Sequence, residues 1–114
     1  MKSILDIILF FIDFNHKNKI INFFKHKFKD QPLTIIDVGA HVGETISLFS
    51  KNFTIKKMIC YEASRLNFNK LTKFRNFKNI NIVLNNIALG SKETELEFFQ
   101  TSESSSSTFC KIDQ

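Results

Sequence analysis

The chain has 114 residues, which is enough for one small domain and too few for two. Apolar residues make up 43% and charged residues 24%, a composition that excludes wholesale disorder. The net charge of +5 comes mainly from scattered lysines, and without a dense basic run or a helix-turn-helix pattern we predict no nucleic-acid partner. Two cysteines stand fifty residues apart with no ligand pairs beside them, so we predict reduced thiols in a cytoplasmic protein and no metal site.

Residues 1–31 are predicted to form an N-terminal helical segment, because apolar residues recur at helical spacing until Pro32 ends the pattern. We expect one or two amphipathic helices over residues 2–29 that pack on the following domain. Lysines flank the apolar stripe, so contact of residues 4–28 with a membrane surface is the less favoured alternative. The apolar run at the start of this segment contains Asp6 and is too short to span a bilayer.

Residues 32–114 are predicted to form an α/β domain in which strands and helices alternate. The first strand is expected at Leu33–Val38, a β-branched run typical of a parallel strand that is buried on both faces. The other expected elements are a helix at 44–53, a strand at 57–62, a helix capped by Ser64, a strand at 80–85 and a strand with one wet face at 95–99. The β-α-β-α-β order predicts half of a doubly wound parallel sheet.

A turn with two glycines follows the first strand and carries the candidate cofactor site. Residues 37–43, Asp-Val-Gly-Ala-His-Val-Gly, read D-x-G-x-x-x-G. Gly39 allows a sharp turn and a close approach of a ligand to the main chain, and Gly43 lets the helix begin close to the strand. Backbone N–H groups from about Val42 onward are expected to be free donors for a carboxylate or another anion.

The residues around this turn favour one nucleoside over others. Glu62 ends the second strand, 19 residues beyond Gly43, where an acid is expected to accept hydrogen bonds from ribose hydroxyls. His41 replaces the second glycine of the dinucleotide fingerprint and would crowd a pyrophosphate, which disfavours NAD. A carboxylate at Asp37 suits the amino group of a methionine moiety and so favours S-adenosylmethionine. The simpler alternatives are a turn cap for Asp37, a solvated carboxylate for Glu62 and a partly exposed turn residue for His41.

Four blocks, in this order, resemble the FkbM-type methyltransferases: 36–45 (Ile-Asp-Val-Gly-Ala-His-Val-Gly-Glu-Thr), 61–64 (Tyr-Glu-Ala-Ser), 86–91 (Asn-Ile-Ala-Leu-Gly-Ser) and the serines at 104–107. The resemblance implies a Rossmann-like class I fold that binds S-adenosylmethionine and methylates hydroxyl groups of sugars and other secondary metabolites. It also implies the cofactor-binding residues: Asp37, Gly39 and Gly43 at the methionine end, Glu62 at the ribose, and Asn86, Ile87 and Ala88 near the adenine. Ala40, His41 and Ala63 are further residues expected to bind the cofactor.

In that family the sheet continues after the serine loop, and in the strand order 3-2-1-4-5 the further strands lie beside strand one. We therefore expect a truncated domain that needs its missing C-terminal half, or a homo-oligomer formed through the open edge of strand one. The expected acceptor is a small molecule such as a carbohydrate, and no catalytic base is assigned. The alternative function is a non-catalytic remnant or interaction module that retains the Rossmann-like half.

Overall fold

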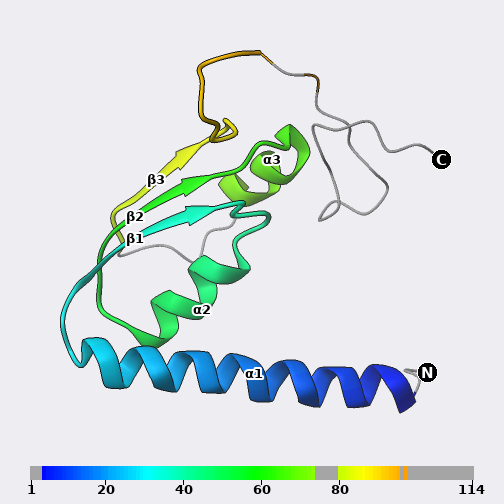
Figure 1. Cartoon of the computed structure of the whole chain (residues 1–114), viewed down its shortest axis with the longest axis vertical. Helices are drawn as coiled ribbons and strands as arrows, with labels where there is room; N and C mark the ends of the chain where they lie inside the picture. Colours follow the sequence, from blue (N-terminus) through cyan, green and yellow to red (C-terminus); the bar gives the residue numbers. More distant parts are fainter. Residues whose placement is uncertain (1–3, 74–79, 96, 98–114) are drawn as a thin grey trace.

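The computed structural model describes residues 4–73, 80–95 and 97, and their side chains from Ile12 onward (Figure 1). Its elements are α1 (Ile4–Phe28), β1 (Leu33–Val38), α2 (Glu44–Asn52), β2 (Ile55–Tyr61), α3 (Arg65–Lys73) and β3 (Ile82–Asn85). The predicted α/β class and the predicted order of these elements are confirmed. Apart from Glu95 and Glu97, the strand expected at 95–99 and the serine loop at 104–107 lie outside the described residues.

The three strands form one parallel sheet in the order β1-β2-β3, with β2 in the centre. Val38 lies opposite Tyr61, and Tyr61 lies opposite Asn85, so the strands end level with one another. Because parallel strands bring their carboxyl ends to the same edge, the turns that follow β1, β2 and β3 are neighbours.

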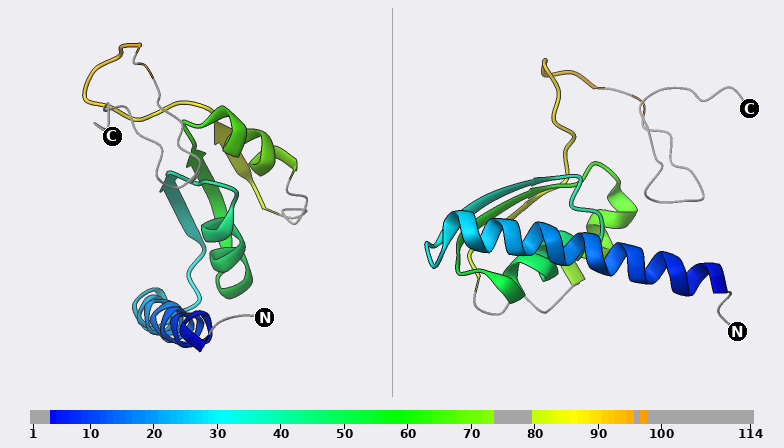
Figure 2. Two further views of the ribbon diagram at one scale, coloured as in Figure 1. Left: turned by 90° about the vertical axis from the view of Figure 1, so that its right-hand side faces the viewer. Right: turned by 60° about the horizontal axis from the view of Figure 1, so that its bottom comes forward.

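The hydrophobic core lies between one face of the sheet and helices α2 and α3. Ile46 of α2 and Leu71 of α3 are fully buried against Met58 and Cys60, which point to the same face of β2. Both helices therefore cover one face, the covered face (Figure 2). The predicted core residues Phe49 and Phe68 pack against this cluster, whereas Phe74 and Phe77 lie outside the described residues.

The opposite face of the sheet, the bare face, has no helix of the described chain on it. Ile36 and Val38 alternate with covered residues along β1 and remain 64% and 62% exposed. The prediction that the first strand is buried on both faces is therefore wrong for these residues. Within the described ranges β1 also pairs with β2 alone, which leaves its other edge open.

The N-terminal segment is a single helix of 25 residues, and among the side chains described from Ile12 onward, those that pack on the domain lie in its C-terminal turns. Ile21 is buried, and the ring of Phe24 lies 5.9 Å from that of Phe49 in α2. The N-terminal half of α1 extends beyond α2 (Figure 2). The expected apolar stripe packs on the domain only in part, because two of its members, Ile12 and Ile20, are exposed, as is Phe23. No helix in the described part of the chain is long and apolar enough to cross a membrane.

Candidate functional site

The turn after β1 is held against the end of β2 by its own backbone. The N–H groups of Gly39 and Ala40 both donate to the carbonyl of Tyr61, at 2.8 and 3.0 Å. Gly39 has a φ of 84° and Gly43 a φ of 99°, values that favour glycine, and His41 is also left-handed with a φ of 50°. A Cβ built on Gly39 meets nothing within 4 Å, so the space above this turn is open.

Asp37 is the titratable group closest to this turn on β1. It points to the covered face, and its Oδ2 is buried without a hydrogen-bond partner among the described residues. Burial raises the pKa of Asp37, and the charges of Glu44 and Glu62 raise it further. Three carboxylates thus gather at one edge of the sheet in a chain whose net charge is +5. Such a cluster favours a ligand that brings a positive charge and hydrogen-bond donors.

Glu62 connects the ends of two elements through its carboxylate. The side chain is 7% exposed, and its Oε2 accepts a hydrogen bond of 2.8 Å from the His41 N–H. Its Oε1 accepts a second bond of 2.8 Å from the Ser64 N–H, at the start of α3. Ser64 in turn caps α3 as predicted, since its Oγ accepts from the Asn67 N–H at 3.3 Å. Glu62 is therefore a buried, bonded residue, and the interpretation as a solvated strand-end carboxylate is wrong.

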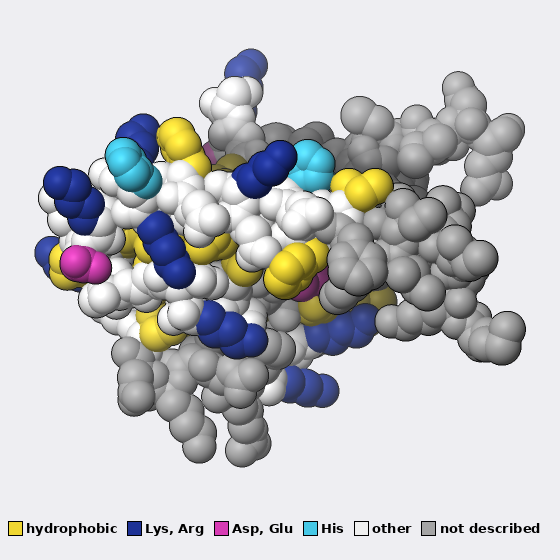
Figure 3. All heavy atoms as spheres, turned by 90° about the horizontal axis from the view of Figure 1, so that it is seen from below, with side chains coloured by type: hydrophobic (Ala, Val, Ile, Leu, Met, Phe, Trp, Pro, Cys, Tyr) yellow, Lys and Arg dark blue, Asp and Glu magenta, His cyan; other side chains and the backbone are white. Residues whose placement is uncertain are grey.

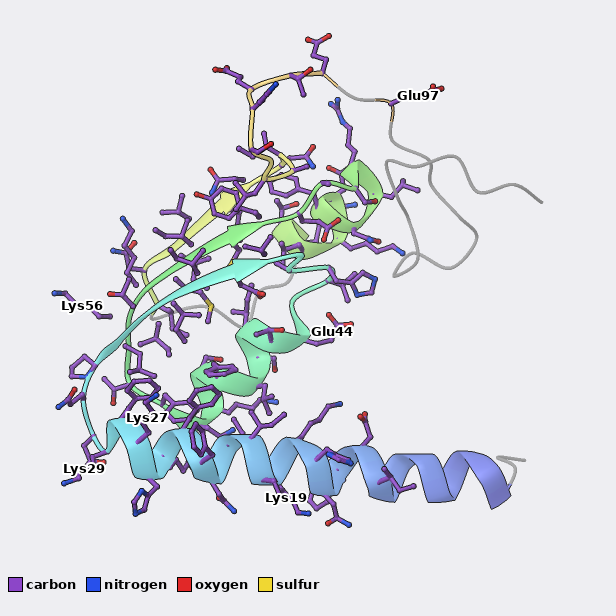
Figure 4. The ribbon with its side chains drawn as sticks, in the orientation of Figure 1. Lys19, Lys27, Lys29, Glu44, Lys56 and Glu97 are labelled. Carbon is purple, nitrogen blue, oxygen red and sulfur yellow. The ribbon has the colours of Figure 1, made fainter. Side chains whose placement is uncertain are left out.

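Glu44 occupies the N-terminal end of α2, below the turn that follows β1 (Figure 4). Its Oε1 lies 3.0 Å from Nδ1 of His41. Partial burial raises the pKa of Glu44, but hydrogen bonds from the N–H groups of Glu44 and Val42 and contact with His41 together lower it. The carboxylate of Glu44 therefore stands at the helix end whose N–H groups the sequence analysis assigned to a ligand anion. The signal for this was an acid in the first helical turn, directly after Gly43.

Asn86 joins the ends of β2 and β3. Its Nδ2 donates to the carbonyl of Glu62 at 2.8 Å and to that of Ala63 at 3.3 Å. The Glu62 N–H donates to the carbonyl of Asn85 at 3.0 Å, so the chain around Glu62 is fixed from both sides. Sequence reasoning placed Asn86 in the site but missed this structural contact.

An open hollow of about 650 Å³ lies beside these residues, beyond the carboxyl ends of β2 and β3. Four of the predicted cofactor-binding residues line it: Ala63, Asn86, Ile87 and Ala88. The rest of its lining, residues 89–94, was not predicted, although the Ala-Leu-Gly sequence at 88–90 marks the end of regular structure there. The hollow accommodates a flat ligand of nucleobase size, with the exposed side chains of Ile87 and Leu89 as apolar contacts.

The predicted site residues thus form two neighbouring groups. The first-turn group contains Asp37, Gly39, Ala40, His41 and Gly43, and Glu62 connects it to the second group at the hollow. Ala40 and Gly43 are buried, so any contact they make with a ligand is through the backbone.

Cys60 lies opposite Asp37 in the sheet. Burial, followed by the charge of Asp37, raises the pKa of the Cys60 thiol to about 11, which makes the thiol unreactive. Among the described side chains, no three His, Cys, Asp or Glu residues are grouped to hold a metal ion.

Comparison of the chain with family models, with curated proteins and with solved structures found no match.

Proposed function

We propose that this chain binds S-adenosylmethionine and contributes the cofactor-binding part of a methyltransferase of the FkbM type. The observation that carries the proposal is the buried Oδ2 of Asp37, which has no hydrogen-bond partner among the described residues and belongs to the residue two positions before Gly39, where a Cβ would meet nothing within 4 Å. An orphaned carboxylate oxygen at this position lacks a donor, and the ammonium of a methionine moiety is a donor with the required charge.

The surrounding charge supports this ligand over a dinucleotide. Glu44 and Glu62 raise the pKa of Asp37, and a bound cation would relieve the same repulsion. A pyrophosphate would instead bring two further negative charges to a group of three carboxylates. Glu44 also places a negative charge in the first turn of α2, beside the N–H donors that a phosphate would need.

Glu62 is the residue we assign to the ribose. Each of its carboxylate oxygens accepts one backbone N–H, and each can accept a second donor. Its two bonds fix the carboxylate before any ligand arrives, so a ribose hydroxyl would meet an acceptor that is already oriented. The hollow at Ala63 and Asn86–Ala88 then lies on the side where we assign the adenine.

When bound, S-adenosylmethionine supplies an electrophilic methyl group on a sulfonium. The residues of this chain would orient it: Asp37 by charge, the Gly39 turn by close approach, and Glu62 by hydrogen bonding. We propose a hydroxyl of a sugar or another secondary metabolite as the acceptor, as the resemblance to the FkbM type implies. The cysteine content supports a cytoplasmic location as part of the proposal. None of the described residues is assigned as a base.

A second candidate function is a non-catalytic interaction module. The observation that favours it is the bare face, where Ile36 and Val38 are exposed beside the open edge of β1. In this case the turn after β1 would be a structural element without a ligand.

Isothermal titration with S-adenosylmethionine separates the two functions. We expect binding by the unaltered chain, and Asp37→Asn and Glu62→Gln should each weaken it by about tenfold to a hundredfold, the usual worth of a charge-assisted hydrogen bond. Asp30→Asn and Glu97→Gln are the matched controls, because both side chains are exposed and lie outside the site. A folded chain that takes up no S-adenosylmethionine would refute the first function and leave the second.

A further inference from the structure

Helix α1 carries two apolar stripes, and the fold uses only one of them. The inner stripe contains Ile21, which is buried, and Phe24 and Phe28, which are half-buried against the domain. The second stripe contains Ile12, Ile20 and Phe23, which are 49%, 49% and 60% exposed. A helix on the surface of a globular domain needs a single apolar stripe, so the second one requires another explanation.

The second stripe is mixed with positive charge. Ile12, His16, Lys19, Phe23 and Lys27 recur at intervals of three or four residues and share one side of α1, which we call the outward face. Lys19 projects from the side of the helix turned away from the sheet (Figure 4). Seen from that side, lysine and histidine side chains alternate with apolar ones (Figure 3). Nζ of Lys27 lies 5.8 Å from the ring centre of Phe23, so charge and apolar surface are in contact.

Acidic side chains do not balance this charge. Between residues 12 and 29 the sequence has five lysines and a single aspartate, Asp13. Asp13 is paired with Lys17 at 2.9 Å, on the flank of the helix. The outward face itself therefore presents apolar side chains and cations.

We propose that the outward face of α1 binds the surface of a membrane that contains anionic lipids. The helix would lie in the plane of the interface, with Ile12 and Phe23 at the boundary between headgroups and acyl chains. The long side chains of Lys19 and Lys27 reach back to the lipid phosphates, which anionic lipids supply at high density. The inner stripe would keep the domain attached to α2. This proposal does not depend on the binding of S-adenosylmethionine.

Two other classes of partner fit the outward face less well. Nucleic acid would use the lysines, but the aliphatic side chain of Ile12 has no role against a phosphate backbone. A second copy of the chain would use the apolar side chains, but a two-fold contact between outward faces would bring the lysines of one copy close to those of the other. An anionic lipid surface satisfies both kinds of side chain.

The absence of tryptophan from the chain allows a direct test. Phe23→Trp places a single fluorophore on the outward face, and Leu66→Trp places one at a similarly exposed site on α3. With vesicles of phosphatidylcholine and phosphatidylglycerol, we expect the emission of the Phe23→Trp chain to shift to the blue and to be quenched by brominated lipid. The Leu66→Trp chain should show neither effect.

Sedimentation with the same vesicles tests the charged and the apolar side chains of the outward face separately. We expect Lys19→Gln with Lys27→Gln to weaken binding by about tenfold or more, as should about 0.5 M salt. Ile12→Ser with Phe23→Ser should weaken binding to a similar extent. The matched controls, Lys56→Gln with Lys73→Gln and Leu66→Ser, change exposed side chains elsewhere and should bind as the unaltered chain does. Circular dichroism verifies that every variant keeps its helix.

Several outcomes would overturn the proposal. It fails if the folded chain does not sediment with the anionic vesicles, or if it binds pure phosphatidylcholine equally well. Equal losses in the control variants would show that general charge, not the outward face, causes the binding. Two results would assign the outward face to another partner, provided that the chain does not bind the vesicles. One is binding of duplex DNA, and the other is a dimer in light scattering. In either case the lysine variant and the apolar variant must both abolish the interaction.

Discussion

The two faces of the sheet are built from the same three strands, yet they differ in what lies on them. On the covered face, Met58 and Cys60 are fully buried beneath α2 and α3. On the bare face, Ile36 and Val38 are more than half exposed, although they are as apolar as their covered neighbours. Apolar character in a strand therefore does not itself produce stability. Stability comes from the surface that the helices remove from water, which here is on one side.

Asp37, which belongs to the candidate site, lies on the covered face of the sheet and not on the bare face. Asp37 alternates with Ile36 and Val38 along β1 and points toward the helices, where burial raises its pKa. The covered face thus contains both the groups that hold the fold together and a charge that opposes folding. Substitutions that separate these contributions test the contrast between the faces.

The largest difference in the free energy of unfolding should appear between alanine variants of two isoleucines, one on each face of the sheet. Ile46→Ala, on the covered face, should lower the free energy of unfolding by about 3 kcal/mol, because it leaves a cavity in the core. Ile36→Ala, on the bare face, should lower it by less than about 0.5 kcal/mol. Urea denaturation measures both. Similar losses in the two variants would mean that something covers the bare face in solution.

A smaller loss is expected where the covered face ends in polar contacts. Glu62→Gln replaces one carboxylate oxygen by an N–H donor and so loses the bond from either His41 or Ser64. We expect the free energy of unfolding to fall by about 2 kcal/mol, since a buried N–H group is then left without an acceptor. The exposed Glu97→Gln serves as the comparison and should change stability little. If urea denaturation gives equal values for the two variants, the bonds of Glu62 do not stabilise the fold.

The smallest expected change in the free energy of unfolding is an increase, in the variant Asp37→Asn. Asp37→Asn removes a buried charge without a partner, so the free energy of unfolding near neutral pH should rise by about 1 kcal/mol. Because the pKa of Asp37 is raised above 3.8 in the folded chain, its contribution is favourable below that value and is lost as the pH rises through the raised pKa. Thermal melts as a function of pH should show this decline in the unaltered chain and a weaker decline in Asp37→Asn.

Glu44 serves as a control for the pH dependence of thermal melts, because its pKa shift has the opposite sign to that of Asp37. Its pKa is lowered from 4.5, so its contribution is present above that value and is lost as the pH falls through the lowered pKa. Glu44→Gln should therefore lose stability at neutral pH, where Asp37→Asn gains it. If both variants move in the same direction, the assignment of the two shifts is incorrect.

The sequence predicted the strands and helices well where local signals are strong. The break at Pro32 and the β-branched run after it gave β1 with its observed ends, and Ser64 caps α3 as expected. The start of β2 was placed too late, at Lys57 instead of Ile55, because two lysines interrupt its apolar pattern. Lys56 is exposed, and a strand tolerates a charged side chain that reaches solvent.

Other features could not be predicted because they depend on what lies next to an element. The pattern of β1 is typical of burial on both faces, but periodicity does not say whether a second layer exists. The outward stripe of α1 was likewise interpreted as part of a single amphipathic pattern. In the site, the residue types at Asp37, Gly39 and Glu62 indicated a nucleoside site, but the bonds of Glu62 to two backbone N–H groups emerge only in three dimensions.

The strand order has one more consequence, which concerns synthesis of the chain. The strands lie in the sheet in the same order as in the sequence, so β2 pairs with a neighbour made before it, and β3 is added at the outside. Among these three described strands, none has to insert between two that are already paired. Each pairing must wait only for the intervening helix, and the sheet can be assembled in one direction as the chain leaves the ribosome.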